Sequence, residues 1–236
     1  MKQFIRRSLR RFGVDIVRVR NQPDLVAFLQ DRHIDLVLDV GANVGQFGKL
    51  LRAKGYRGKI VSFEPIESMF ESLQKAARAD GNWEAHHFAL GARAETSKIN
   101  IAGASTYSSI LPMNDVAVLH DPAAAIMREE TIEIQRLDDV LVNPSGNILL
   151  KIDTQGYERQ VLEGALKGLS MMKGVIMELP IIHLYKGTWA VHEAIEYMAD
   201  AGFVPAQIHP VNYHLMDRLS LLEVDCLFRR CDKRLD

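Results

Sequence analysis

Short apolar runs alternate with longer amphipathic stretches along most of the chain. Runs rich in Val, Ile and Leu are typical of buried parallel strands, and apolar positions spaced three to four residues apart predict helices. The predicted strands cover residues 35–40, 59–63, 84–89, 147–152, 174–178, 203–208 and 221–228. The predicted helices cover residues 24–30, the stretch from the glycine turn at 41–45 to near Gly55, 65–80, 157–167 and 189–201. This alternation favours a parallel sheet with helices on both faces.

The middle of the chain follows another pattern. Residues 98–101 and 131–135 alternate polar with apolar side chains, as half-exposed strands do, and we expect them to pair as an antiparallel flap. Between them, residues 103–130 are too long for structureless filler and predict a functional lid or an extra helix.

The elements together predict an α/β fold: a Rossmann-like, doubly wound, mostly parallel seven-stranded sheet with an antiparallel last strand. We expect a domain over residues 34–236, preceded by an N-terminal helical extension over residues 1–33. The length of 236 residues suits one α/β domain with a full core.

Composition narrows the class of protein. Hydrophobic residues make up 47% and charged residues 25%, which argues against long disorder, and the formal net charge of -1 gives no general attraction to nucleic acid. The N-terminus is a local exception, because Lys2, Arg6, Arg7, Arg10 and Arg11 surround Phe4, Ile5 and Leu9. This pattern predicts a solvated first helix or, alternatively, weak peripheral contact with an acidic membrane or a partner.

The distribution of apolar residues also bears on where the protein is located. The basic start is not followed by an unbroken apolar segment, and no run reaches the length of a membrane span, so we expect neither a secretory signal nor a transmembrane segment. Cys226 and Cys231 offer no disulfide framework. The expected compartment is therefore the reducing cytoplasm.

The first motif with chemistry is the turn after residues 35–40. Residues 38–46 read Leu-Asp-Val-Gly-Ala-Asn-Val-Gly-Gln, so Gly41 and Gly45 open a helix with the spacing Gly-x-x-x-Gly. This differs from the Gly-x-Gly-x-x-Gly of dinucleotide binders. Asp39 suits the ammonium group of an amino-acid ligand and would repel a pyrophosphate. The motif thus favours S-adenosylmethionine over NAD, with a plain strand-to-helix turn as the alternative.

The second motif is Glu64, at the end of the strand predicted at 59–63 and about twenty residues after the glycine turn. In open α/β sheets, ligands lie beyond the carboxyl ends of strands, and a carboxylate there can accept hydrogen bonds from both hydroxyls of a ribose. The alternative is an exposed glutamate that stabilises a helix start.

Further motifs resemble one family. Residues 151–158 read Lys-Ile-Asp-Thr-Gln-Gly-Tyr-Glu, similar to the Lys-Ile-Asp-x-Glu-Gly-x-Glu segment of the FkbM-like class I methyltransferases, with Gln155 in place of the commoner glutamate. Other matches, in the same order, are 89–91, 108–111, 136–139 and 224–228, and the resemblance spans about residues 36–229. It implies S-adenosylmethionine-dependent O-methylation, often of a sugar hydroxyl on a glycolipid, polysaccharide or glycosylated natural product.

The expected contacts fall into two groups. The residues expected to bind the cofactor are Asp39, Gly41, Asn43, Gly45, Gln46, Phe47, Glu64, Pro65, Ala89, Leu90 and Asp153. Those expected to bind the acceptor are Ser108, Ser109, Lys151, Tyr157 and Tyr185, with Tyr107 and Trp189 as further aromatic candidates for stacking on a sugar.

Catalysis needs a base, since a sugar hydroxyl is a poor nucleophile until its proton is removed. Asp153 is the first candidate, with Glu178 and His183 as its partners. The same three residues could instead form a weak divalent-metal site, which we do not favour. The structural alternatives are that Asp153 caps a helix and that Glu178 pairs with a buried Lys151.

Two other functions remain to be weighed. A nucleotide-dependent oxidoreductase or epimerase would need a Tyr-x-x-x-Lys helix, but Ala201 stands four residues after Tyr197. A catalytically silent cofactor-binding protein would keep the sheet and the glycine turn without turnover.

Overall fold

The computed structural model describes residues 24–142, 144–214 and 217–231. The basic segment at the start of the chain, and with it the expected membrane or partner contact, lies outside the described residues. Within them, every helix is too short or too polar to cross a lipid bilayer.

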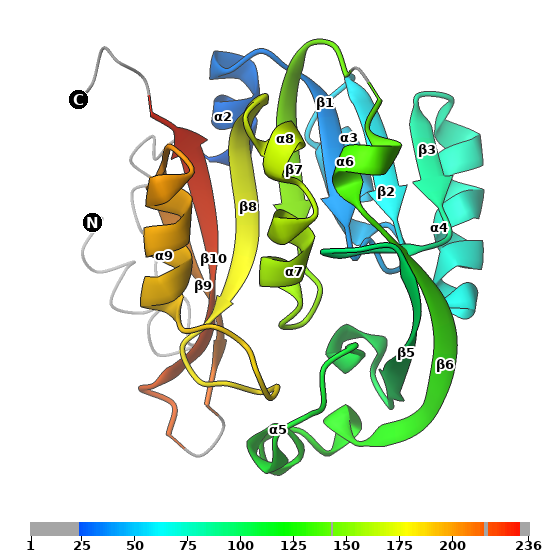
Figure 1. Cartoon of the computed structure of the whole chain (residues 1–236), viewed down its shortest axis with the longest axis vertical. Helices are drawn as coiled ribbons and strands as arrows, with labels where there is room; N and C mark the ends of the chain where they lie inside the picture. The colour runs from blue at the N-terminus through cyan, green and yellow to red at the C-terminus, as the bar shows by residue number, and fades with distance from the viewer. Residues whose placement is uncertain (1–23, 143, 215–216, 232–236) are drawn as a thin grey trace, which may run out of the picture.

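A seven-stranded sheet forms the centre of the fold (Figure 1). Its strands are β1 (Ile34–Val40), β2 (Lys59–Phe63), β3 (Trp83–His86), β7 (Asn147–Ile152), β8 (Met172–Pro180), β9 (Phe203–Tyr213) and β10 (Leu221–Arg230). They lie in the order β3-β2-β1-β7-β8-β10-β9. Neighbours from β3 to β8 pair in parallel, whereas β10 is antiparallel to both β8 and β9. The predicted fold class is confirmed, and the antiparallel last strand lies inside the sheet rather than at its edge.

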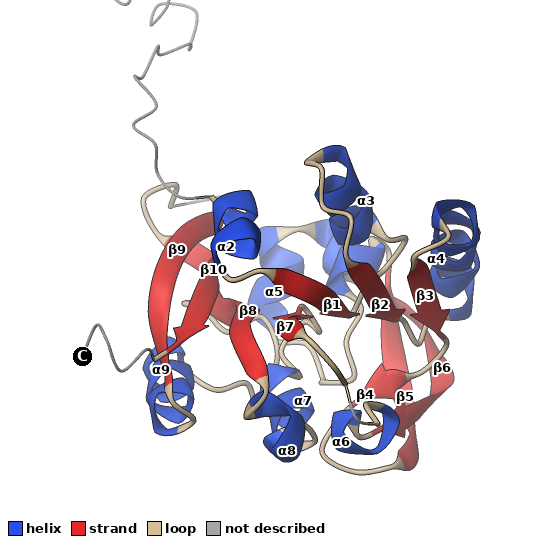
Figure 2. Cartoon of the chain, turned by 90° about the horizontal axis from the view of Figure 1, so that it is seen from above, coloured by secondary structure: helices blue, strands red, loops and turns tan. Residues whose placement is uncertain are grey.

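Helices cover both faces of this sheet. The helices are α2 (Leu25–Asp31), α3 (Gln46–Ala53), α4 (Glu67–Asp80), α6 (Leu137–Val140), α7 (Glu158–Glu163), α8 (Leu166–Leu169) and α9 (Val191–Asp200). Figure 2 shows α2, α3 and α4 on one face and α6 to α9 on the other. Side chains of one strand alternate between the two cores: Val37 packs on the first face, whereas Leu36 and Leu38 pack on the second. Because both faces are buried, such strands are apolar throughout.

A second, smaller sheet lies beyond the carboxyl ends of the parallel strands (Figure 1). It contains β4 (Ala89–Leu90), β5 (Glu95–Ala102) and β6 (Ile126–Gln135). The antiparallel pairing of β5 with β6 confirms the predicted flap. Between β5 and β6 lie η1 (Ser105–Tyr107), α5 (Asp115–His120) and η2 (Pro122–Ala124). Residues 103–130 thus contain helical structure, which was one of the two predictions for this stretch.

Several predicted boundaries were wrong, and two of them lie at contacts between distant parts of the chain. The strand expected at 84–89 ends at His86, where pairing with β2 stops, and Ala89 instead pairs with Ile134 in the second sheet. The helix expected at 157–167 is broken at Gly164 into α7 and α8. At this break Gly164 lies against a distant part of the chain, since a Cβ built on it would lie 1.9 Å from the carbonyl oxygen of Gly91.

Gly164 therefore offers a test of this packing. We expect Gly164→Ala to lower the free energy of unfolding by about 3 kcal/mol, because its backbone suits alanine but the added methyl overlaps a backbone carbonyl that cannot move freely. Urea unfolding measures the change. Gly168→Ala is the matched control, since its Cβ would meet nothing closer than 3.4 Å, and its free energy should stay within about 1 kcal/mol of wild type. Equal effects of the two substitutions would contradict this account.

Candidate functional site

The site begins where β1 and β7 end side by side. From β1 the chain continues to β2 on one side, while β7 lies on the other, so the two ends form the switch point of the sheet. Gly41 has φ +73°, and a Cβ there would lie 1.9 Å from the carbonyl oxygen of Asp153. Asp153 N–H donates to Val40 O at 3.0 Å, which joins the two turns. Glycine is required at position 41 by both its conformation and this contact.

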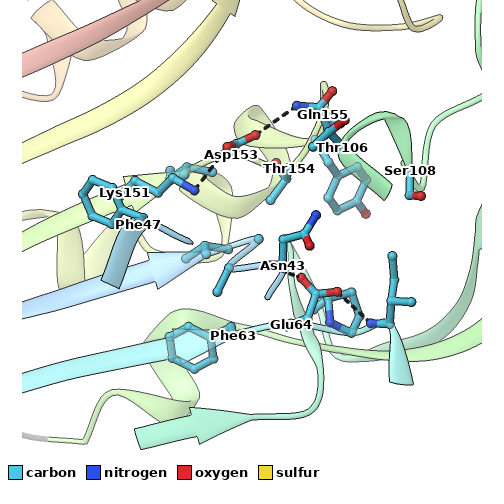
Figure 3. A pocket seen from close by; sticks show the side chains of 18 of the residues that line it. Asn43, Phe47, Phe63, Glu64, Thr106, Ser108, Lys151, Asp153, Thr154 and Gln155 are labelled. Atoms are coloured by element: carbon cyan, nitrogen blue, oxygen red, sulfur yellow. Dashed lines mark hydrogen bonds and ion pairs between the residues drawn. The ribbon is translucent and has the colours of Figure 1, made fainter. Parts of the chain in front are cut away.

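A pocket of about 370 Å³ opens at this switch point. Its walls come from the ends of β1, β2 and β7, the start of α3 and the region between β5 and α5. Of the residues expected at the site, it is lined by Gly41, Asn43, Gln46, Phe47, Glu64, Pro65, Ala89, Leu90, Ser108, Lys151, Asp153 and Tyr157. Several of these side chains surround the same space in Figure 3.

Other expected residues lie outside that lining. They are Asp39, Gly45, Ser109, Glu178, His183 and Tyr185. Conversely, the pocket is also lined by residues that the sequence did not assign individually: Ile66, Ile99, Thr106, Ile110, Gln155, Ile176 and Asp225. Ile99 and Ile110 carried no signal of their own, because their place depends on how the second sheet and the segment after β5 fold over the first sheet.

Glu64 is buried at the end of β2, with its carboxylate on the pocket. Its two oxygens accept hydrogen bonds from the N–H of Asn43 at 2.7 Å and of Ile66 at 2.8 Å. Burial raises the pKa of Glu64 to about 7, and the two N–H donors oppose that rise. Each oxygen keeps a lone pair that a hydroxyl in the pocket can use.

Asn43 also connects the glycine turn to η1 through a hydrogen bond. Its side-chain amide donates to Ser105 Oγ of η1 at 3.1 Å, and its backbone adopts φ +50°. Ser108 is buried, and its Oγ accepts from the N–H of Ala102 at 3.1 Å. Ser105 and Ser108 thus hold this wall of the pocket together through hydrogen bonds within the protein.

Lys151 forms the buried charge centre of the site. Its ammonium lies 3.4 Å from Asp39 Oδ1 and 3.2 Å from Asp153 Oδ2, over the ring of Phe47. Burial opposes its charge, but the two carboxylates prevail and raise the pKa of Lys151, so it stays an ammonium. The partners of Lys151 are therefore Asp39 and Asp153, and the alternative in which Lys151 pairs with Glu178 was wrong. Asp39, fully buried, faces Lys151 and the hydroxyl of Ser62.

The three candidate catalytic residues are placed differently. Asp153 and Glu178 are joined through Gln155, whose Nε2 donates to Asp153 Oδ1 at 3.0 Å and to Glu178 Oε2 at 2.9 Å. His183 instead lies against the hydroxyl of Thr188. Burial, followed by Asp153 and the carboxylates of β10, raises the pKa of Glu178.

The acceptor candidates outside the pocket support this cluster. Ser109 Oγ donates to the carbonyl of Gln155 at 2.7 Å, and the hydroxyl of Tyr185 lies 2.8 Å from Gln155 Oε1. Tyr185 is only 3% exposed and Trp189 only 4%, so neither ring is open for stacking.

The alternative of a metal site is not supported. Across residues 24–142, 144–214 and 217–231, no group of three or more His, Cys, Asp or Glu side chains could hold a metal ion. Asp153, Glu178 and His183 do not converge on one point.

Glu158 holds the loop that carries Asp153 and Gln155. Its Oε1 accepts from the N–H of Thr154, the hydroxyl of Thr154 and the N–H of Gly156. Its Oε2 is buried without a hydrogen-bond partner among the described residues. Burial raises the pKa of Glu158 to about 7, which suits a protonated acid at that position.

A comparison with protein families finds one match. The model of the methyltransferase FkbM domain matches residues 39–205, most of the chain. This match includes the ends of β1, β2 and β7 that build the pocket.

Two curated proteins are similar to the chain in sequence. Methyltransferase 1 of Beauveria bassiana (strain ARSEF 2860) is 27% identical over 162 residues, which cover 60% of this chain and 61% of the relative. Methyltransferase sdnD of Sordaria araneosa is 27% identical over 159 residues, 54% of this chain and 59% of the relative. The chain thus spans about three fifths of the length of these curated relatives.

Among solved structures, the methyltransferase FkbM of Methylobacillus flagellatus KT is similar in fold. The TM-score is 0.52 at 16% sequence identity, over 83% of this chain and 43% of that chain. At this identity the likeness is one of fold.

The raised pKa of Glu158 makes stability depend on pH. The folded protein holds a proton on Glu158 up to about pH 7, whereas an unfolded glutamate releases it near 4.5. The folded state therefore binds more protons between these values, and this contribution to stability is lost as the pH rises from 4.5 to 7. We expect Glu158→Gln to gain about 3 kcal/mol relative to wild type over that interval, because glutamine cannot ionise.

Urea unfolding at a series of pH values measures this gain. Glu163→Gln, on the same helix but with a half-exposed side chain in an ion pair with Arg159, is the control and should follow the wild-type curve. Parallel curves for wild type and Glu158→Gln would show that folding does not raise the pKa of Glu158.

Proposed function

Since a methyltransferase FkbM domain accounts for residues 39–205, the chain belongs to the FkbM methyltransferase family, and we propose that it is an S-adenosylmethionine-dependent O-methyltransferase. The proposed acceptor is a sugar hydroxyl of a glycolipid, a polysaccharide or a glycosylated natural product. The observation that carries this proposal is the position of Asp153, a carboxylate on the wall of the pocket at the switch point of the sheet.

The residues present fit the cofactor. The absence of a side chain on Gly41 keeps the backbone accessible at the end of β1, and Glu64 offers carboxylate oxygens to the ribose hydroxyls. Ile66, Leu90 and Ile99 supply an apolar wall for an adenine ring. Asp39 would act through Lys151, since it is buried beneath the pocket.

Asp153 is the proposed base. Lys151 holds its Oδ2 and Gln155 its Oδ1, while each oxygen retains a lone pair for an acceptor hydroxyl. When bound, S-adenosylmethionine supplies a methyl group that is already electrophilic, so the protein has to align the acceptor and exclude water. Asp153 would take the proton of the acceptor hydroxyl as the hydroxyl oxygen bonds to the methyl carbon that the cofactor would supply, which leaves the cofactor as the demethylated thioether.

Of the two alternatives, the oxidoreductase or epimerase loses its basis, because the family is one of methyltransferases. A catalytically silent protein would bind the cofactor without transferring its methyl group, so a measurement of turnover distinguishes it from the proposed enzyme. For the compartment we propose the reducing cytoplasm, in which the free thiols of Cys226 and Cys231 would persist.

The cofactor proposal predicts a specific loss of binding. We expect Glu64→Gln to weaken S-adenosylmethionine about ten- to a hundredfold, because an amide offers one acceptor oxygen where the carboxylate offers two. Isothermal titration calorimetry gives the Kd. Glu84→Gln is the matched control: this exposed residue of β3 pairs with Lys59, and its Kd should match the wild type. An unchanged Kd for S-adenosylmethionine in Glu64→Gln would contradict the proposed contact between Glu64 and the ribose hydroxyls.

The methyl-transfer proposal predicts a separate loss. We expect Asp153→Asn to lower kcat about a hundredfold or more at unchanged Kd for the cofactor, since asparagine cannot take the proton. Transfer of a labelled methyl group to a panel of glycosides measures turnover. Asp200→Asn, at the exposed end of α9, should keep full activity. A wild type that binds cofactor but methylates no hydroxyl would favour the silent protein.

A further inference from the structure

The side chain of Gln155 lies between two carboxylates that would otherwise face each other. Its Nε2 donates to Asp153 Oδ1 at 3.0 Å and to Glu178 Oε2 at 2.9 Å. An amide nitrogen carries two hydrogens, so both are used in these bonds. Figure 3 shows Gln155 on one side of Asp153 and Lys151 on the other.

Tyr185 determines which way the amide points. Its hydroxyl lies 2.8 Å from Gln155 Oε1 and 3.1 Å from the carbonyl of Tyr107. Asp153 offers Gln155 only an acceptor oxygen, so the NH₂ group of Gln155 faces Asp153 and its Oε1 faces Tyr185. Of the two acceptors near the Tyr185 hydroxyl, Gln155 Oε1 is nearer than the carbonyl of Tyr107, and the hydroxyl donates to it. Burial, followed by the nearby Glu223 and Glu178, raises the pKa of Tyr185, so the hydroxyl keeps its proton.

The backbone of Gln155 is held as firmly as its side chain. Gln155 has φ +56°, a left-handed conformation that a residue with a Cβ adopts at a cost. Ser109 Oγ donates to its carbonyl at 2.7 Å, and Glu158 accepts from the N–H of Gly156 at 3.1 Å. Such strain persists where the surrounding structure fixes it, and it often marks a functional site.

Acidic side chains dominate the surroundings of this amide. The titratable groups that face the pair of carboxylates are Lys151 of β7, Glu158 of α7, Glu223 and Asp225 of β10, His209 of β9 beside Asp225, and Tyr107 and Tyr185 from the loops. Lys151 is already engaged by Asp153 and Asp39. The two N–H groups of Gln155 are therefore the donors that keep Asp153 and Glu178 apart without a shared proton.

We propose that Gln155 is a positioning residue: its amide, oriented by Tyr185, holds Asp153 toward the pocket and separates it from Glu178. The inference rests on the proposed function, in which Asp153 is the base. A carboxylate at position 155 would have no hydrogens to donate, and the three acids would have to share protons.

The first test needs no cofactor. We expect the melting temperature of Gln155→Glu to fall relative to wild type as the pH rises from 5 to 8, because its folded state holds an extra proton that the unfolded chain releases. Gln155→Met removes the donors without adding a charge, so its offset from wild type should change less with pH. Gln74→Glu on α4 controls for the added charge, and its offset should stay constant.

The second test uses turnover. In Gln155→Glu, we expect the acidic limb of the kcat/KM profile to move up by one pH unit or more, while the Kd of S-adenosylmethionine stays within about twofold of wild type. In Tyr185→Phe, the amide loses its orienting donor, and kcat should fall about tenfold at unchanged cofactor KM.

The outcomes separate the two proposals. If the wild type methylates an acceptor and the pH profiles of wild type and Gln155→Glu coincide, the positioning role is overturned and the proposed function stands. Parallel melting curves for Gln155→Glu and Gln155→Met would likewise overturn it. If the wild type methylates no hydroxyl although it binds cofactor, the proposed function fails, and the catalytic role of Gln155 fails with it.

Discussion

The close approach of two backbone turns organises this protein. The turn after β1 and the turn after β7 touch at Gly41 and Asp153, with no room for a Cβ between them. The contact is sequentially remote, since more than a hundred residues separate the two strands, yet it brings the glycine turn beside the loop that carries Asp153 and Gln155. Without it, the pocket would lose the junction between its two walls.

Charge is the second constraint, and it follows from the first. The meeting of β1 and β7 places Asp39 and Asp153 on one buried cation, Lys151. A buried charge persists in a protein interior only when it is paired, so Lys151 and Asp39 depend on each other, while the more exposed Asp153 adds a second carboxylate beside the ammonium. Glu64 and Glu158 form no ion pair and accept hydrogen bonds from backbone N–H groups instead. Burial raises the pKa of both, as it also raises that of Asp39.

The second sheet turns an open strand edge into a pocket. Its strands β5 and β6 and the segment between them cover the carboxyl ends of the parallel strands, and Ser105 is hydrogen-bonded to Asn43 of the glycine turn. The segment between β5 and β6 also contacts the residues around Asp153. Ser109 donates a hydrogen bond to the carbonyl of Gln155, and the carbonyl of Tyr107 lies 3.1 Å from the hydroxyl of Tyr185. The glycine turn and the loop that carries Gln155 are thus joined, through this segment, in one hydrogen-bonded structure.

Local patterns in the sequence were sufficient for the central sheet and the glycine turn. Strand β2 and strand β7 lie where their apolar runs predicted them, and the antiparallel flap has its predicted partners, since periodicity is a property of neighbouring residues. The break at Gly164 and the transfer of Ala89 to the second sheet depend on contacts with distant residues, so no local pattern contained them. The sequence likewise pointed to Asp153, Glu178 and His183 as a group, but only the tertiary structure decided that Gln155 joins Asp153 to Glu178, that His183 lies against Thr188, and that Lys151 pairs with Asp39. The physical reason is that spacing along a chain determines which face a side chain occupies, whereas the partner it meets there is determined by the packing of other elements.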